Sequence, residues 1–201
     1  ASLPRVDRLM SDKQKQSVKD KIFDRYPELK QTKDYNKRII VYAPTFRKHR
    51  DISSEIESLI DEIKAEDRII VIKKHPLMEL SMEESKGVII DKFFSTEEML
   101  YIADYVISDY SAIVFEAALL EKRMCFFAFD LDEYKASRSF YLDYESDMPG
   151  DICRTAYEVE TSLRDSHFDV DAVRSFAHSY VEKTDYVTKE LADIVLMKKM
   201  S

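Results

Sequence analysis

Short apolar runs recur along this chain, and amphipathic segments separate them. The runs are RIIVYAPT (38–45), RIIVIKKH (68–75), GVII (87–90), YVISD (105–109) and MCFFAF (124–129). They are rich in β-branched residues and show no polar alternation, which is typical of strands buried on both faces of a parallel sheet. The sequence therefore predicts a sheet covered by other elements on each side.

Helical patterns fill the intervals between these runs. Residues 53–66 place Ile56, Leu59, Ile60 and Ile63 on one stripe, and Ser53 or Ser54 is the expected N-cap. Residues 95–103 open with S-T-E-E, a capping-box pattern, and 111–122 form an apolar helix. Alternating strands and helices predict an α/β fold, a doubly wound parallel sheet with helices on both faces.

The two ends of the chain have a more polar texture. A helix is expected over residues 11–26, ended by Pro27, and further helices over 155–165, 169–183 and 185–199. We therefore divide the chain into a segment with a helix (1–36), an α/β domain (37–150) and C-terminal helices packed on that domain (151–201).

Glycine is scarce, since Gly87 and Gly150 are the only two among 201 residues. They cannot form G-x-G-x-x-G or G-x-x-x-x-G-K-[ST], so Gly-rich phosphate loops are excluded. The formal net charge of −8 argues against a nucleic-acid binder. Cys125 and Cys153 lack metal-ligand spacing and favour a reducing, intracellular setting.

Neither a spanning segment nor a signal peptide is expected. No apolar run reaches the ~18 residues that a membrane helix needs. The start, ASLPRVDRLM, has no charged segment followed by an apolar one, and it resembles the start of a fragment cut from a longer protein.

Three polar clusters follow predicted strands, where open α/β folds bind ligands. The first is APTFRKHR (43–50), in which Thr45 offers a hydroxyl and Arg47, Lys48 and Arg50 offer positive charge. This cluster predicts a phosphate site, or alternatively a solvated basic loop.

The second cluster is KKHP (73–76). Two lysines beside His75 disfavour the imidazolium, so the ring is expected to be neutral near pH 7 and able to act as a base or a hydrogen-bond donor. The alternative is a surface histidine in a loop.

The third cluster is SDYSA (108–112), which precedes the predicted helix 111–122. Ser108, Asp109 and Ser111 lie where helix N–H groups are unpaired, so they predict either an anion site or a plain helix cap. Glu116 is unusual in this apolar helix, and it either pairs with a base or contacts a ligand hydroxyl.

Five segments in this order resemble the CDP-glycerol glycerophosphotransferase family, whose members build teichoic acids and related cell-surface polymers. They are LPRVDRL (3–9), IIVYAPTFR (39–47), KKHP (73–76), YVISDYSAIVFEAALLEK (105–122) and FAFDLDEYKASRSFYLDYESDMPG (127–150). The resemblance covers roughly residues 2–155.

This resemblance implies a GT-B architecture of two Rossmann-like domains. The chain would be the C-terminal, nucleotide-binding half, with its interdomain segment and a helix in 1–36. The donor would be CDP-glycerol or CDP-ribitol, and the acceptor a polymer or lipid-linked hydroxyl that attacks the β-phosphorus and releases CMP. The N-terminal half, with a second important histidine, would be absent. The family works at the inner leaflet, which implies a cytoplasmic, peripheral protein. The sequence shows no cluster of carboxylates that would require a metal ion.

Carried over by position, the catalytic residue would be His75, in the family's H-P motif near the pyrophosphate. The expected nucleotide- and phosphate-binding residues are Thr45, Arg47, Lys74, Ser108, Asp109, Ser111, Glu116 and Arg138. Two positions depart from the family pattern: Ala112 replaces the second Ser of D-Y-S-S, and Ser2 replaces a frequent Gly. The alternatives are a GT-B glycosyltransferase or epimerase that uses a sugar nucleotide, and a non-catalytic nucleotide-binding module, which Ala112 would fit.

Overall fold

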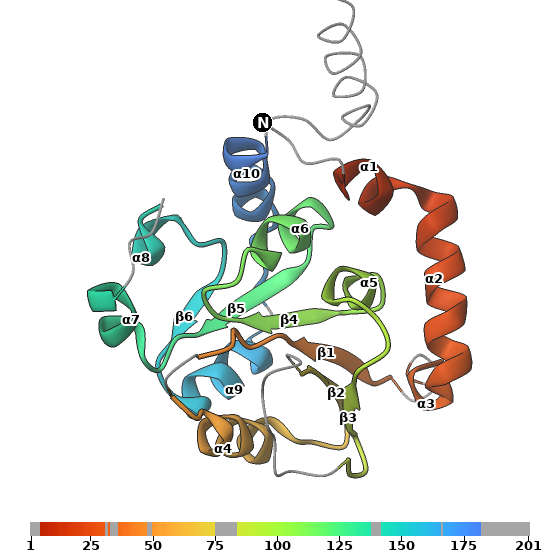
Figure 1. Ribbon diagram of the computed structural model, residues 1–201, viewed down its shortest axis with the longest axis horizontal. Coiled ribbons are helices and arrows are strands. Elements are labelled where there is room, and N and C mark those ends of the chain that lie inside the picture. The colour runs from red at the N-terminus through yellow and green to blue at the C-terminus, as the bar shows by residue number, and fades with distance from the viewer. Residues whose placement is uncertain are drawn as a thin grey trace, which may run out of the picture.

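One parallel sheet of six strands organises the molecule (Figure 1). The computed structural model describes residues 5–30, 32, 36–47, 50–74, 84–137, 142–165 and 167–181. The strands are β1 (Arg38–Tyr42), β2 (Arg68–Lys73), β3 (Val88–Asp91), β4 (Tyr105–Ser108), β5 (Arg123–Phe127) and β6 (Asp151–Cys153). Their order is β3-β2-β1-β4-β5-β6, so the direction of the winding reverses between β1 and β4. The predicted doubly wound α/β fold is confirmed.

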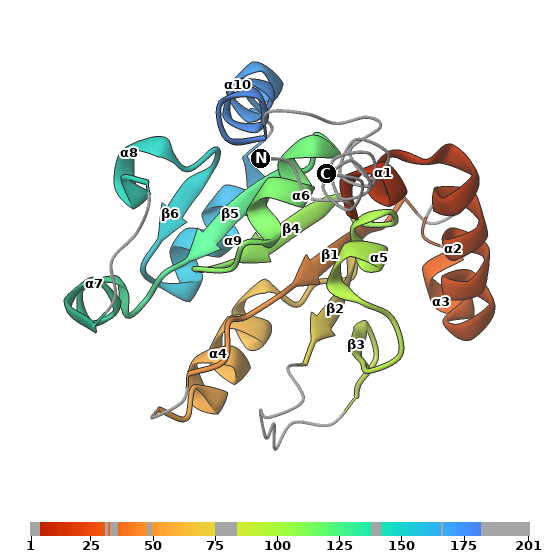
Figure 2. The same cartoon turned by 45° about the horizontal axis from the view of Figure 1, so that its top comes forward.

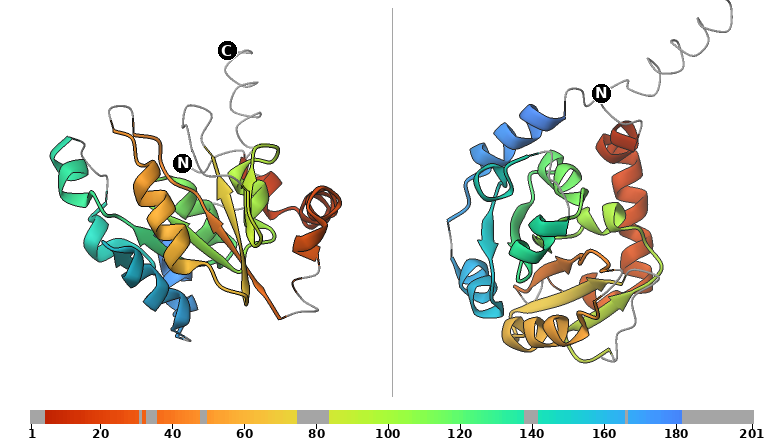
Figure 3. Two further views of the ribbon diagram at one scale, coloured as in Figure 1. Left: turned by 90° about the horizontal axis from the view of Figure 1, so that it is seen from below. Right: turned by 60° about the vertical axis from the view of Figure 1, so that its left-hand side comes forward.

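Helices cover both faces of this sheet. They are α1 (Arg5–Met10), α2 (Asp12–Arg25), α3 (Pro27–Lys30), α4 (Ser53–Ile63), α5 (Thr96–Leu100), α6 (Ile113–Leu119), α7 (Leu131–Ser137), α8 (Tyr144–Asp147), α9 (Ala156–Arg164) and α10 (Val170–Tyr180). Helices α4 and α9 pack on one face, and α2, α5, α6 and α10 contribute to the core on the other. Figure 3 shows α4 and α9 on the opposite side of the sheet from α2, and Figure 2 places α4 beneath it.

The continuous apolar runs are explained by these two cores. Along β1, Ile39 and Val41 enter the core under α2 and α6, whereas Ile40 and Tyr42 enter the core under α4. Successive side chains of a strand point to opposite faces, so both faces must be apolar when both are covered.

The helix boundaries agree with the sequence at some ends and differ at others. The capping box is confirmed, since Ser95 and Glu98 cap each other at the start of α5. The expected serine cap of α4 is wrong: the N-cap is Ile52, and Asp51 instead accepts a hydrogen bond from the Ser53 N–H. Pro27 does follow the end of α2, but it also begins α3, a position that proline suits. The helix expected over 185–199 lies outside the described residues.

Strand β6 was not expected from the sequence. It has three residues, and its first, Asp151, is exposed, so no apolar run marks it. It pairs with β5 and carries the sheet past residue 150. Gly150, the residue before β6, lies directly against β5. A Cβ there would be 2.2 Å from the Met124 carbonyl oxygen, so the close approach of two backbones requires glycine.

Candidate functional site

The loops after β1 and β4 meet at the point where the strand order reverses. The Thr45 N–H donates to both carboxylate oxygens of Asp109 at 3.0 and 2.9 Å, and the Thr45 hydroxyl donates to the same carboxylate. The Ser108 hydroxyl donates to the Ala43 carbonyl at 3.2 Å. Side chains therefore join the two loops at the place where open α/β sheets bind ligands.

Arg47 is buried beside this junction, with 9% of its surface exposed. Its Nε and Nη2 donate to the two carboxylate oxygens of Asp130 at 2.9 and 3.1 Å, and its Nη1 lies 3.1 Å from Asp109. The same Nη1 donates to the Thr45 carbonyl at 2.7 Å. This guanidinium, expected from the sequence to serve phosphate, is thus surrounded by carboxylates of its own chain.

Aromatic rings complete the surroundings of Arg47. Its guanidinium carbon is 4.8 Å from the ring centroid of Tyr110 and 5.3 Å from that of Tyr134. These two rings stack on each other at 3.8 Å, and Tyr144 donates to the Asp109 carbonyl at 2.9 Å. Cation–π contact and bidentate ion pairing are both characteristic of structural arginines.

Asp130 keeps its negative charge despite its burial. Burial raises the pKa of this carboxyl, but hydrogen bonds and charge from Arg47 outweigh it, and the pKa of Asp130 lies below its usual range. The Tyr110 hydroxyl donates to Asp130 at 2.8 Å, and burial together with that carboxylate raises the pKa of Tyr110. We call Thr45, Arg47, Asp109, Asp130 and Tyr110 the Arg47 network.

Sequence reasoning missed Asp130 and Tyr110 as members of this network. Asp130 follows β5, and its contact with Arg47 joins residues 83 positions apart. The available signal was its position: like Arg47 and Asp109, it comes directly after a buried strand.

Ser111 and Glu116 belong to the start and the body of α6. The Ser111 hydroxyl accepts a hydrogen bond from the Ile113 N–H at 3.3 Å, while Ala112, the N-cap, offers no side-chain bond. Glu116 is buried in α6 with 4% exposed. The half-buried Ser111 therefore accepts a hydrogen bond from the first N–H of the helix and also lies beside the junction of the β1 and β4 loops.

The two lysines after β2 have different surroundings. Lys73 is buried and donates to the Asp91 carboxylate and to the Phe94 carbonyl, and Tyr26 donates to Asp91 at 2.8 Å. Lys74 is half-buried at the carboxyl end of the strand. His75 and Arg138 lie outside the described residues, so their expected roles stay predictions.

Among the described residues there is neither a candidate metal site nor a helix that could span a membrane. No three His, Cys, Asp or Glu side chains there gather in a way that could hold a metal ion. None of the helices described is both long enough and apolar enough to cross a membrane.

Comparisons with known proteins identify relatives of this chain. Residues 2–194 match the model of the CDP-Glycerol:Poly(glycerophosphate) glycerophosphotransferase family. A teichoic acid poly(ribitol-phosphate) polymerase of Bacillus spizizenii is 30% identical over 195 residues, which cover 91% of this chain and 30% of that protein. A teichoic acid ribitol-phosphate primase of the same organism is 28% identical over 204 residues, covering 96% of this chain and 51% of that one.

Solved structures agree in fold. A variant of the wall teichoic acid polymerase TagF, soaked with CDPG, has a TM-score of 0.71 at 23% identity, covering 97% of this chain and 50% of TagF. An UDP-N-acetylglucosamine 2-epimerase from Listeria monocytogenes has a TM-score of 0.53 at 12% identity, covering 88% of this chain and 49% of the epimerase.

The matches cover most of this chain but only part of each relative. The chain spans about a third to a half of the length of these curated relatives. The family model nevertheless covers almost all of its 201 residues, including both loops of the site described above. The chain belongs to the CDP-Glycerol:Poly(glycerophosphate) glycerophosphotransferase family.

Proposed function

We propose that this chain is the donor-binding half of a polyol-phosphate transferase. The donor is CDP-glycerol or CDP-ribitol, and the acceptor is a hydroxyl of a teichoic-acid-like or capsular polymer, or of its lipid-linked primer. The observation that carries the proposal is the family match over residues 2–194. The relatives named as teichoic acid polymerases and primases support this choice over the sugar-nucleotide alternative.

The proposal includes the rest of the enzyme and its place in the cell. The acceptor is bound with the help of a second α/β half that precedes the segment 1–36. The donor-binding unit comprises residues 37–150 together with β6, and α9 and α10 pack on it. The packing of α9 against α4 and of α10 against α6 supports this arrangement. The enzyme works in the cytoplasm at the inner face of the membrane.

The proposed donor site lies at the carboxyl ends of β1, β2 and β4. The charges of the Arg47 network and the Ser108 hydroxyl already have partners in the chain. We therefore assign these groups the role of keeping the loops in place. The contacts to the pyrophosphate come from Ser111, Lys74, Arg138 and the N–H groups that precede α6. Glu116 supports the start of this site from α6.

The proposed reaction is an in-line displacement. The acceptor oxygen forms a bond to the β-phosphorus, the bond from that phosphorus to the bridging oxygen breaks, and CMP leaves. His75 donates a hydrogen bond to the transferred phosphate or a proton to the leaving group, and a base in the other half takes the acceptor proton. Most of the work falls to positioning and charge neutralisation.

Calorimetry tests the donor. We expect the chain to bind CDP-glycerol or CDP-ribitol more tightly than UDP-N-acetylglucosamine, with CMP as a weaker ligand. Tighter binding of the uridine ligand would overturn the proposal in favour of a sugar-nucleotide enzyme.

A variant at Ser111 tests the site itself. Ser111→Asp keeps a side-chain acceptor for the Ile113 N–H but places a carboxylate beside the proposed pyrophosphate. We expect the affinity for CDP-glycerol to fall about tenfold or more, because like charges repel, while the melting temperature is retained. Ser17→Asp, on the exposed side of α2, is the matched control. Unchanged affinity in Ser111→Asp would leave Ser111 as a plain cap.

A further inference from the structure

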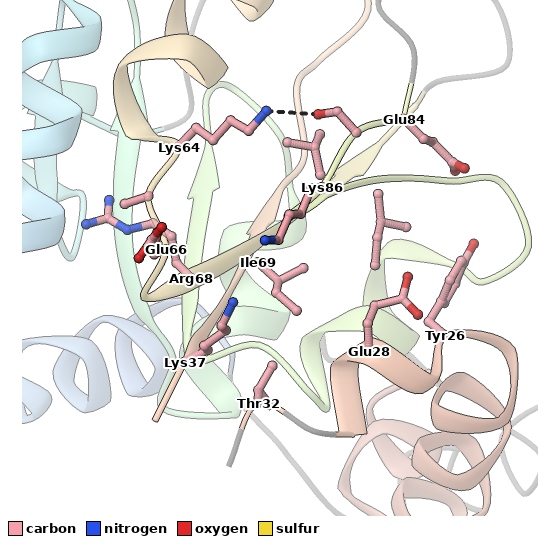
Figure 4. Close-up of a pocket in the computed structure, with 15 residues that line it drawn as sticks. Tyr26, Glu28, Thr32, Lys37, Lys64, Glu66, Arg68, Ile69, Glu84 and Lys86 are labelled. Atoms are coloured by element: carbon pink, nitrogen blue, oxygen red, sulfur yellow. Dashed lines mark hydrogen bonds between the residues drawn. The ribbon is translucent and has the colours of Figure 1, made fainter. Parts of the chain in front are cut away.

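A cavity of about 1340 Å³ opens at the opposite edge of the sheet, among the amino-terminal ends of β1, β2 and β3 (Figure 4). Helix α3 and the residues after α4 also border it. The Arg47 network lies at the other side of the sheet, beyond the carboxyl ends of β1, β4 and β5. This cavity is therefore separate from the proposed donor site.

Positive charge is available in this cavity. Lys37, which precedes β1, and Lys86, which precedes β3, both line it, and Figure 4 shows their side chains directed into the lined space near Ile69. Within the part of the chain that the structure describes, neither ammonium group has an ion-pair partner. In a chain with a net charge of −8, two such cations lining one hollow favour an anionic ligand.

The other cations at this edge are already occupied. Arg68 is 3% exposed and donates to Glu160 at 2.6 Å and to the Ile63 carbonyl at 3.1 Å. Lys64 donates to the Ser85 hydroxyl at 3.1 Å. Lys37 and Lys86 are thus the cations of the lining with no such bond among the described residues.

The other residues that line the cavity indicate which class of anion it can bind. Glu28 and Glu66 line the same cavity with carboxylates, and Glu84 lines it while accepting a hydrogen bond from the Ile90 N–H at 3.3 Å. Buried Ile69 and Val88 offer an apolar wall. A ligand that carries only phosphates would be repelled by these carboxylates, whereas a ligand that also carries hydroxyl groups can donate hydrogen bonds to them. The cavity also exceeds the ~300–1,000 Å³ that is usual for a single small molecule.

A nucleotide fits this lining less well. Tyr26 is the aromatic residue among the described ones that line the cavity, and its hydroxyl is bonded to Asp91 at 2.8 Å. Its ring is tilted against Phe94 with 6.3 Å between centroids. The described lining therefore has no pair of aromatic rings between which a nucleotide base could stack.

We propose that this cavity binds a polyol phosphodiester, with Lys37 and Lys86 pairing with phosphates and the glutamates accepting hydrogen bonds from the polyol hydroxyls. The choice of polyol phosphate rests on the proposed function, since a transferase of this kind makes such a chain. The cavity then holds a length of polymer away from the reacting end.

The experiment compares two charge-matched double variants of the 201-residue chain. Lys37→Gln/Lys86→Gln removes the cavity lysines, and Lys13→Gln/Lys21→Gln removes two exposed lysines of α2. The probes are a soluble glycerol-phosphate hexamer, vesicles of phosphatidylglycerol in phosphatidylcholine, and CDP-glycerol. The first two carry the same headgroup chemistry from different sources.

We expect the cavity variant to bind the hexamer about fivefold more weakly, as two exposed ammonium–phosphate contacts are lost, while the α2 variant binds as the wild type does. Saturating CDP-glycerol should leave hexamer binding unchanged, because the two sites lie at opposite edges. If only vesicle binding depends on the cavity lysines, the lipid headgroup is the source of the phosphodiester.

Equal binding by all three proteins, or equal losses in both variants, would overturn the proposal. Competition between CDP-glycerol and the hexamer would also overturn it, since one site would then explain both. The measurement with CDP-glycerol tests the donor site separately from the cavity. Lysine-dependent hexamer binding without CDP-glycerol binding would sustain the cavity and refute the donor site.

Discussion

Arg47 and Lys37 lie beyond opposite ends of the same strand, and their charges have opposite fates. Arg47 follows the carboxyl end of β1 and is buried, with Asp109 and Asp130 as ion-pair partners. Lys37 precedes the amino end of β1, lines an open cavity and has no ion-pair partner among the described residues. The cation that the sequence marked for phosphate is thus occupied by its own chain, and a cation that the sequence did not mark is available.

The difference teaches how burial determines the use of a charge. A charged group can be buried only when partners replace its lost water, so Arg47 is accompanied by two carboxylates and a carbonyl. A partly exposed lysine keeps its water and needs no partner until a ligand arrives. Local charge in a sequence therefore shows neither whether a side chain is buried nor whether it can bind.

The largest expected effect follows from removing the buried cation. Arg47→Met leaves Asp109 and Asp130 without their counter-ion, and we expect a loss of about 3–5 kcal/mol in the free energy of unfolding. Urea denaturation at pH 7 measures it. Arg50→Met is the matched control, since Arg50 is in the same loop but pairs with Glu55 and Glu133 in the open, and about 1 kcal/mol or less is expected there. Equal losses in the two variants would break the comparison.

An effect of intermediate size depends on pH. The folded pKa of Asp130 lies below its value in the unfolded chain, which is about 3.9. Ionised Asp130 therefore stabilises the fold above that pH, and the contribution disappears as the pH falls through the folded pKa. Asp130→Asn should cost most near pH 7, and the difference from the wild type should shrink below about pH 4. The urea midpoints of both proteins between pH 3 and 7 check this. A difference in stability that stays constant over this range would show that the charge of Asp130 does not stabilise the fold.

The smallest effect is expected at the cavity lysines. Lys37→Gln/Lys86→Gln removes no described ion pair, so the melting temperature should change by less than about 2 °C. Differential scanning calorimetry of the variant without ligand measures this. A clearly lower melting temperature would mean that these lysines stabilise the fold, and the contrast with Arg47 would lose its basis.

Much of the sheet could be predicted because its signal is local. The apolar runs at 38–45, 68–75 and 105–109 each contain a described strand, and burial on both faces of the sheet explains why apolar residues occupy consecutive positions within each run. The capping box of α5 is equally local, since Ser95 and Glu98 are three positions apart. Strand β6 was missed for the opposite reason, because it exists only through its pairing with β5.

The candidate site was predicted in position but not in its internal contacts. Residues after buried parallel strands must gather at one edge of the sheet, which is why Thr45, Ser108 and Asp109 were identified together. The ion-pair partners of Arg47 were not predicted. Asp109 and Asp130 follow two other strands, and the sequence does not state the order of these strands in the sheet.

By itself, the amino-acid sequence determined the fold class, the family and the edge of the sheet where the donor is proposed to bind, because periodicity and motif order are properties of the chain read along its length. Only the tertiary structure decided which charges are already neutralised. It paired Arg47 with carboxylates 62 and 83 positions away, placed Gly150 against the Met124 carbonyl, and left Lys37 and Lys86 in an open cavity. Such outcomes depend on distances between strands that are remote in sequence, and those distances exist only once the sheet has formed.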